Sequence, residues 1–187
     1  MRIFLTMKHW QLFVLFIGLP LFLEILMIVL VVATADTRIL FYVFPVMMIL
    51  CIGSLFGWLY SLGTSLYKRL PENAAMSLTR FKIFFFIPVG YILSLLVFMF
   101  WAYKNAALVG QPHAWIFLLI FPLHLFAMFC IFYCLYFIAK ALKAVEWQRP
   151  VTFSDYVGEF FLLWFHFVGV WFIQPRINKL FDPAPGS

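Results

Sequence analysis

Charged residues are scarce in this chain. They make up 11% of its 187 residues, and hydrophobic residues make up 66%. An ordinary globular domain has about 25% charged residues and about 45–50% apolar residues. A soluble domain of this size could not hide so much apolar surface from water. The composition therefore excludes a soluble enzyme or binding domain and indicates a chain that lies in a lipid bilayer.

Cysteine is also rare, and its three occurrences, Cys51, Cys130 and Cys134, lie inside apolar stretches without CxxC spacing. An odd number of cysteines in such stretches argues against a disulfide framework. Cys130 and Cys134 are one helical turn apart and could share a face with a metal, but no third ligand accompanies them. We therefore interpret them as small buried hydrophobic residues, and we expect no metal.

Signatures of catalysis are missing as well. The sequence contains no Walker loop, no dinucleotide-binding glycine motif, no HExxH and no recognisable Ser-His-Asp set. We therefore expect no catalytic residue, no cofactor and no enzymatic activity. The net charge of +6 does not form a basic stripe, because the basic residues sit between apolar segments. This placement favours contact with membrane lipids and excludes nucleic acid as the expected partner.

Long apolar runs dominate what is present. They cover residues 10–33, 39–62, 82–103 and 114–139, and each is long enough to cross a hydrocarbon core of about 30 Å as a helix. The first run is too long for the core of a signal peptide, and Pro20 is expected to kink it. The predicted fold is an all-α polytopic transmembrane helical bundle, with one domain over 1–181 and a disordered tail over 182–187.

A shorter apolar helix is predicted over about 155–174, and it could be re-entrant, interfacial or spanning. If the N-terminus is cytoplasmic and four helices cross, only Arg38 and Lys104 of the 13 basic residues lie outside. If the fifth segment also crosses, Arg176 and Lys179 join them there. The excess of basic residues expected on the cytoplasmic side favours four crossings.

Two polar residues lie within the predicted spans. Glu24 is in the first span and His124 is in the fourth, just after Pro122. A carboxylate at membrane depth costs about 2.5–3.5 kcal/mol on insertion scales, so it usually faces the bundle interior or water. The two side chains could therefore meet as a proton or ion relay. The alternative is a protonated glutamate and a structural histidine, each in an interhelical hydrogen bond.

A third set of polar residues lies on the fifth segment. Glu159 and His166 are about two helical turns apart, with Asp155 one turn before Glu159, so a single helix would place them on one face. They could line a cavity, or serve an enzyme that acts on lipids. The spacing expected of a helical metal site is absent.

Small residues recur at four-residue intervals along the second span, at Gly53, Gly57 and Ser61. Such a face lets helix backbones approach closely. The contact could lie inside the protomer or between protomers, and the second case would make the chain a homo-oligomer.

Basic and aromatic residues gather after the second span and at the end of the chain. Such residues belong at a membrane interface, where they anchor a bundle or dock a lipid or protein partner. The predicted interface or docking residues are Lys68, Arg69, Arg80, Lys82, Trp171, Arg176 and Lys179.

Four stretches of the chain, Leu78–Val89, Ala139–Lys143, Val151–Glu159 and Trp171–Lys179, resemble a family of small uncharacterised multi-pass proteins common in Bacteroidota. The last stretch reads W-F-I-Q-P-R-I-N-K. The resemblance implies a location in the bacterial inner (cytoplasmic) membrane. It implies no activity, and no functional residue is carried over from it.

The leading hypothesis is a non-enzymatic membrane subunit that oligomerises or docks a cytosolic or membrane protein through its cytoplasmic loops. Small four-helix proteins of bacterial antiphage systems offer an analogy in size and topology. The first alternative is a small transporter or channel that uses Glu24 and His124. The second is a membrane enzyme that acts on lipids through Glu159 and His166.

Overall fold

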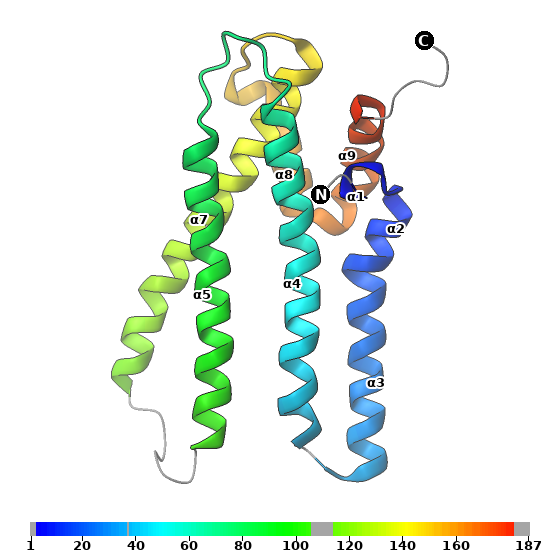
Figure 1. Ribbon diagram of the computed structural model, residues 1–187, viewed down its shortest axis with the longest axis vertical. Helices are drawn as coiled ribbons and strands as arrows, with labels where there is room; N and C mark the ends of the chain where they lie inside the picture. The colour runs from blue at the N-terminus through cyan, green and yellow to red at the C-terminus, as the bar shows by residue number, and fades with distance from the viewer. Residues whose placement is uncertain (1–2, 37, 106–113, 182–187) are drawn as a thin grey trace.

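The computed structural model describes residues 3–36, 38–105 and 114–181 (Figure 1). Within these ranges the chain forms helices and short connections and contains no strand. The predicted disordered tail over 182–187 and most of the connection between the third and fourth spans lie outside the described residues.

Within the described part of the chain, four helices are long and apolar enough to cross a membrane, as predicted. The first, His9–Thr34, is made of α2 (His9–Phe13), the π-helical turn η1 (Val14–Gly18) and α3 (Leu19–Thr34). The others are α4 (Arg38–Tyr67), α5 (Leu78–Lys104) and α7 (Ala114–Trp147). Both α4 and α7 continue beyond the predicted apolar runs. The long helices therefore reach past the apolar layer at one end of the bundle.

The predicted disturbance at Pro20 takes the form of the π-helical turn η1, which ends two residues before the proline. Proline has no N–H, so it cannot bond the carbonyl four residues earlier, and its ring crowds that carbonyl. The wider turn accommodates this crowding, and the Leu19 N–H donates to the carbonyl of Val14, five residues back. The first span therefore continues through the proline.

The fifth segment differs from the single helix predicted over 155–174. It consists of α8 (Phe153–Trp164) and α9 (His166–Phe181), and the helix breaks at Phe165, where φ is −86° and ψ is 56°. Figure 1 shows α8 descending from the end of α7 and α9 returning to the same end of the bundle. This hairpin therefore does not run the length of the four long helices.

Gly169 permits the close approach of the two hairpin helices. A Cβ atom at this position would lie 1.7 Å from the carbonyl oxygen of Leu162 on α8. Only glycine leaves room for a backbone so near. The tight turn at Phe165 and this contact fix the hairpin.

The core lies at one end of the bundle, where the hairpin packs against α7 and the short helix α1 (Ile3–Thr6) packs against α4 and α9. Trp58, Leu62, Phe81, Leu142 and Ile173 are among its fully buried side chains.

The same end holds most of the basic residues, and we call it the basic end. Among the described residues it contains Lys8, Lys68, Arg69, Arg80, Lys82, Lys140, Lys143, Arg149, Arg176 and Lys179. The opposite end has Arg38 and Lys104 and exposes most of its apolar side chains.

Candidate functional site

Glu24 and His124 do not meet in this structure. Glu24 lies on α3, is exposed, and makes no hydrogen bond or ion pair with any described residue. His124 lies exposed on α7, and its Nδ1 is 3.4 Å from the hydroxyl of Tyr91 on α5. Figure 1 shows α3 at one edge of the bundle and the first half of α7 at the opposite edge. The two polar residues therefore face different surroundings.

An ion-pair cluster at the basic end connects α7, α8 and α9. Arg176 donates through Nε and a terminal nitrogen to the two carboxylate oxygens of Glu146, at 2.6 and 2.5 Å. The same guanidinium lies 2.9 Å from Glu159, and the Lys143 ammonium lies 2.7 Å from Glu159. Two cations and two carboxylates balance in charge. Such compensation is what a partly buried charge needs to be stable.

The protonation of this cluster follows from its contacts. Burial raises the pKa of Glu159, but hydrogen bonds from Lys143 and Arg176 more than offset this effect and hold the pKa below its usual range. Hydrogen bonds to Glu146 raise the pKa of Arg176. A carboxylate with a lowered pKa is a poor general acid or base at neutral pH. The cluster is therefore suited to holding helices together.

The opposite face of α9 fixes the start of the chain. Gln174 accepts a hydrogen bond from the indole N–H of Trp58 at 3.0 Å and donates to the carbonyls of Phe4 and Met7 at 2.8 and 2.9 Å. Asn178, one turn later, donates to the carbonyl of Met7 at 3.2 Å. The sequence reasoning missed this role. Its only signal is a pair of amides spaced by four residues on one helix.

The predicted polar stripe of Asp155, Glu159 and His166 is wrong, because the helix breaks before His166. The His166 ring instead packs edge-on against Phe16, with the ring centroids 6.0 Å apart. Asp155 accepts a hydrogen bond from the Thr152 N–H at 2.8 Å, and this contact lowers the pKa of Asp155. Within the described ranges, no group of three His, Cys, Asp or Glu residues is placed to hold a metal.

The small residues of α4 divide between two environments. A Cβ atom at Gly57 would lie 2.9 Å from the ring of Phe4, and Ser61 is completely buried. These two positions therefore serve packing within the protomer. Gly53 has no atom within 4 Å of its Cβ position, and it borders a small apolar groove between α4 and α5.

The predicted basic interface residues line two separate cavities. Lys68, Arg69 and Lys82 border a cavity of about 520 Å³ between α4, α5 and the end of α9. In this cavity Arg69 donates to the carbonyl of Leu180 and lies 4.2 Å from the ring centroid of Phe181. Arg80 borders a second cavity on the other side of α5.

The remaining interface residues lie on α9. Trp171 is 44% exposed and packs beside His9, with the ring centroids 4.8 Å apart. Lys179 is exposed, whereas Arg176 is engaged in the ion-pair cluster. Of the α9 cations, Lys179 alone therefore stays available for contact with lipid or protein.

A scan of protein-family models and searches of curated proteins and solved structures find no match for this chain. The resemblance to the Bacteroidota family therefore stays a prediction. The helices themselves identify the chain as a multi-pass integral membrane protein with four apolar helices long enough to cross the bilayer.

Proposed function

We propose that this chain is a non-enzymatic subunit of a bacterial inner-membrane assembly, in which a helix of another chain covers the face of α3 that carries Glu24. The observation that carries the proposal is the exposure of Glu24 within a membrane span. In a lone chain this carboxyl group would face hydrocarbon, at a cost of about 2.5–3.5 kcal/mol. A neighbouring helix that offers a hydrogen-bond partner removes that cost.

The surroundings of Glu24 support a helix as its neighbour. Phe22, Ile25 and Ile28 are each more than half exposed, so an apolar stripe flanks the carboxyl group on α3. Association of helices in lipid depends on close packing and on polar contacts across the interface. This face offers an apolar surface for packing and one polar group for a specific contact.

The rival functions find less support in the geometry. Transport needs polar residues that converge on one pathway, whereas the helices carrying Glu24 and His124 lie at opposite edges of the bundle (Figure 1). An enzyme that used Glu159 and His166 would need both near one substrate. Glu159 is instead ion-paired, and His166 packs against Phe16.

The charge of the basic end favours docking of a partner on the cytoplasmic side of the membrane. Under the positive-inside rule its cations favour a cytoplasmic location for the N-terminus and for both ends of the α8–α9 hairpin. The exposed Lys68 and Lys82 are available there for a cytosolic partner with an acidic surface.

Native mass spectrometry of the protein, extracted gently from its own host, tests the proposal. We expect a homo-oligomer or a complex with a second polypeptide. Glu24→Leu should dissociate the complex. Glu24→Gln should retain part of the complex, because an amide still forms hydrogen bonds. The control Ile25→Leu should leave the complex intact. A wild-type monomer, or a complex indifferent to Glu24→Leu, would contradict the proposal. A monomer with pH-dependent flux that Glu24→Gln abolishes would establish transport instead.

A further inference from the structure

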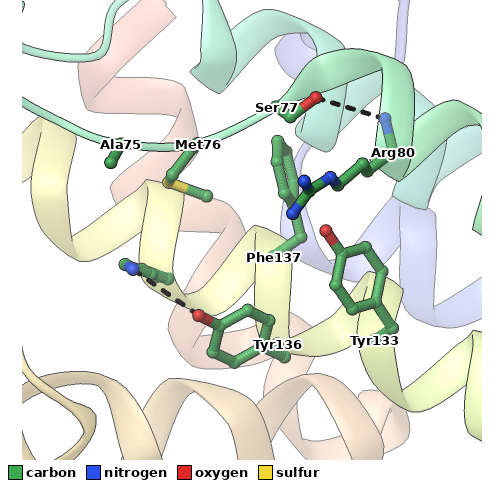
Figure 2. A pocket seen from close by; sticks show the side chains of 8 residues that line it. Ala75, Met76, Ser77, Arg80, Tyr133, Tyr136 and Phe137 are labelled. Carbon is green, nitrogen blue, oxygen red and sulfur yellow. Dashed lines mark hydrogen bonds between the residues drawn. The ribbon is translucent and has the colours of Figure 1, made fainter.

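A cavity of about 420 Å³ lies between the start of α5 and the C-terminal half of α7 (Figure 2). Residues of the α4–α5 connection form its rim, and Phe137 of α7 forms part of its wall. Two cations, Arg80 and Lys140, and two tyrosines, Tyr133 and Tyr136, also line it. The cavity is therefore rich in groups that attract anions.

Neither cation forms an ion pair with a described residue. The ion pairs among the described residues join Lys143 and Arg176 to Glu146 and Glu159, and none involves Arg80 or Lys140. Arg80 is exposed, so its guanidinium can be reached from outside the protein. Lys140 is half-buried and lies 3.5 Å from the Tyr136 hydroxyl. Lys143, one turn further along the same helix, differs from Lys140 because it forms an ion pair with Glu159.

Hydroxyl groups and the start of a helix add to this anion-attracting character. Figure 2 shows the Tyr133 hydroxyl beside the Arg80 side chain, facing the same space. Ser77 caps α5 by accepting a hydrogen bond from the Arg80 N–H at 3.4 Å. The N-terminus of this long helix carries a partial positive charge. Guanidinium, ammonium and hydroxyl donors together match the oxygen atoms of a phosphate group.

An aromatic surface leads from the cavity into the membrane-spanning part of the bundle. Phe84 on α5 packs against Tyr133 at 4.4 Å and against Phe129 at 6.2 Å between ring centroids. Ile83 and Phe129 are each more than half exposed beside this path. A ligand that occupied both features would have an anionic head and an apolar tail.

We infer that this cavity is a binding site for an anionic phospholipid, with the phosphate between Arg80 and Lys140 and the acyl chains along Phe84 and Phe129. The position fits, because Arg80 lies in the first turn of α5 and Lys140 directly follows the apolar run 114–139 of α7. Basic residues at the ends of apolar runs are where anionic headgroups are bound. The inference does not depend on Glu24 or on a protein partner.

Native mass spectrometry of the full chain in mild detergent tests the site, with phosphatidylglycerol, phosphatidylethanolamine or inorganic phosphate added in separate titrations. We expect one saturable phosphatidylglycerol adduct per chain, much weaker binding of phosphatidylethanolamine, and no competition from millimolar phosphate. The double variant Arg80→Gln/Lys140→Gln should bind phosphatidylglycerol about thirtyfold more weakly, because each cation lost near the membrane surface weakens binding about fivefold.

The matched control is Lys8→Gln/Arg149→Gln, which removes the same charge from exposed positions at the same end of the bundle that line neither basic cavity. It should leave the adduct unchanged. Equal weakening in both double variants would overturn the inference, because general attraction to the basic end would then explain the binding. Displacement of the lipid by inorganic phosphate would overturn the lipid assignment and leave a site for small anions. The wild-type titrations decide between these ligands even if a variant fails to fold.

Discussion

Arg176 joins three helices through one side chain. Its planar guanidinium contacts Glu146 on α7 and Glu159 on α8 from a position on α9. Arginine suits this position because it donates several hydrogen bonds in a fixed plane, whereas lysine offers a single ammonium group. The residue predicted as a docking group therefore has an internal contact that explains its presence.

Replacing Arg176 by Gln should destabilise the fold by about 2–3 kcal/mol. Removal of one partner of a buried ion pair typically costs about 3–5 kcal/mol, and the partial exposure of this guanidinium reduces that figure. Thermal unfolding of the detergent-solubilised protein measures the effect. Lys179→Gln, on the same helix but without an ion pair among the described residues, is the control. Equal melting temperatures for the two variants would mean that the cluster contributes nothing.

The lowered pKa of Glu159 predicts how the stability of the fold depends on pH. The pKa of Glu159 in the folded state lies below the ordinary value of 4.5. The stability that Glu159 contributes is therefore fully present above its pKa in the unfolded state, and it is lost as the pH falls through its pKa in the folded state. The melting temperature should therefore stay level from pH 8 to about 5.5 and fall below about 4.5. In Glu159→Gln the fall should be smaller. An identical pH profile in this variant would show that other carboxylates dominate.

At the scale of the element, the α8–α9 hairpin depends on one glycine. Gly169→Ala would place a methyl group 1.7 Å from the Leu162 carbonyl oxygen, so the helices must separate. We expect a loss of about 2–3 kcal/mol, as in other overpacked contacts. Gly158→Ala on α8 meets no atom within 4 Å and should stabilise the helix by about 0.5–1 kcal/mol. Thermal unfolding of both variants should give shifts of opposite sign, and a neutral Gly169→Ala would refute the close contact.

The four long helices could be predicted from the sequence because each apolar run exceeds the thickness of the membrane core. The hairpin could not, because neither proline nor glycine marks the break at Phe165, and the contact that fixes it joins Gly169 to Leu162. Pro175 does not mark the end of a helix either. It lies inside α9, where Gln174 and Arg176 hold the helix through contacts with distant parts of the chain.

The candidate site was less predictable than the fold. Glu24 is surrounded by apolar residues on every side of its helix, so no hydrophobic face indicates which way it points. Its outward orientation follows from the packing of α3 against α4. The partners Glu146 and Arg176 are 30 residues apart, and no local pattern connects them.

At the scale of the whole molecule, the basic residues and the compact core lie at one end of the bundle. The positive-inside rule predicts that this end faces the cytoplasm. Single cysteines at Lys68, Lys104 and Lys179, in a chain whose Cys51, Cys130 and Cys134 are replaced by alanine, can be labelled in intact cells with an impermeant maleimide. The cysteine at position 104 should react directly. Those at positions 68 and 179 should react only after permeabilisation. If position 179 reacted together with position 104, the fifth segment would cross the membrane.

The proposed assembly predicts that a helix of another chain lies against α3. A photoreactive phenylalanine analogue at Phe22, which is 63% exposed beside Glu24, can report this neighbour in living cells. We predict a covalent adduct of one defined protein mass, either a dimer of this chain or a complex with a second polypeptide, and its loss when Glu24→Leu is added. Adducts with lipid alone, or a protein adduct unchanged by Glu24→Leu, would contradict the assignment of this chain as a subunit assembled through α3.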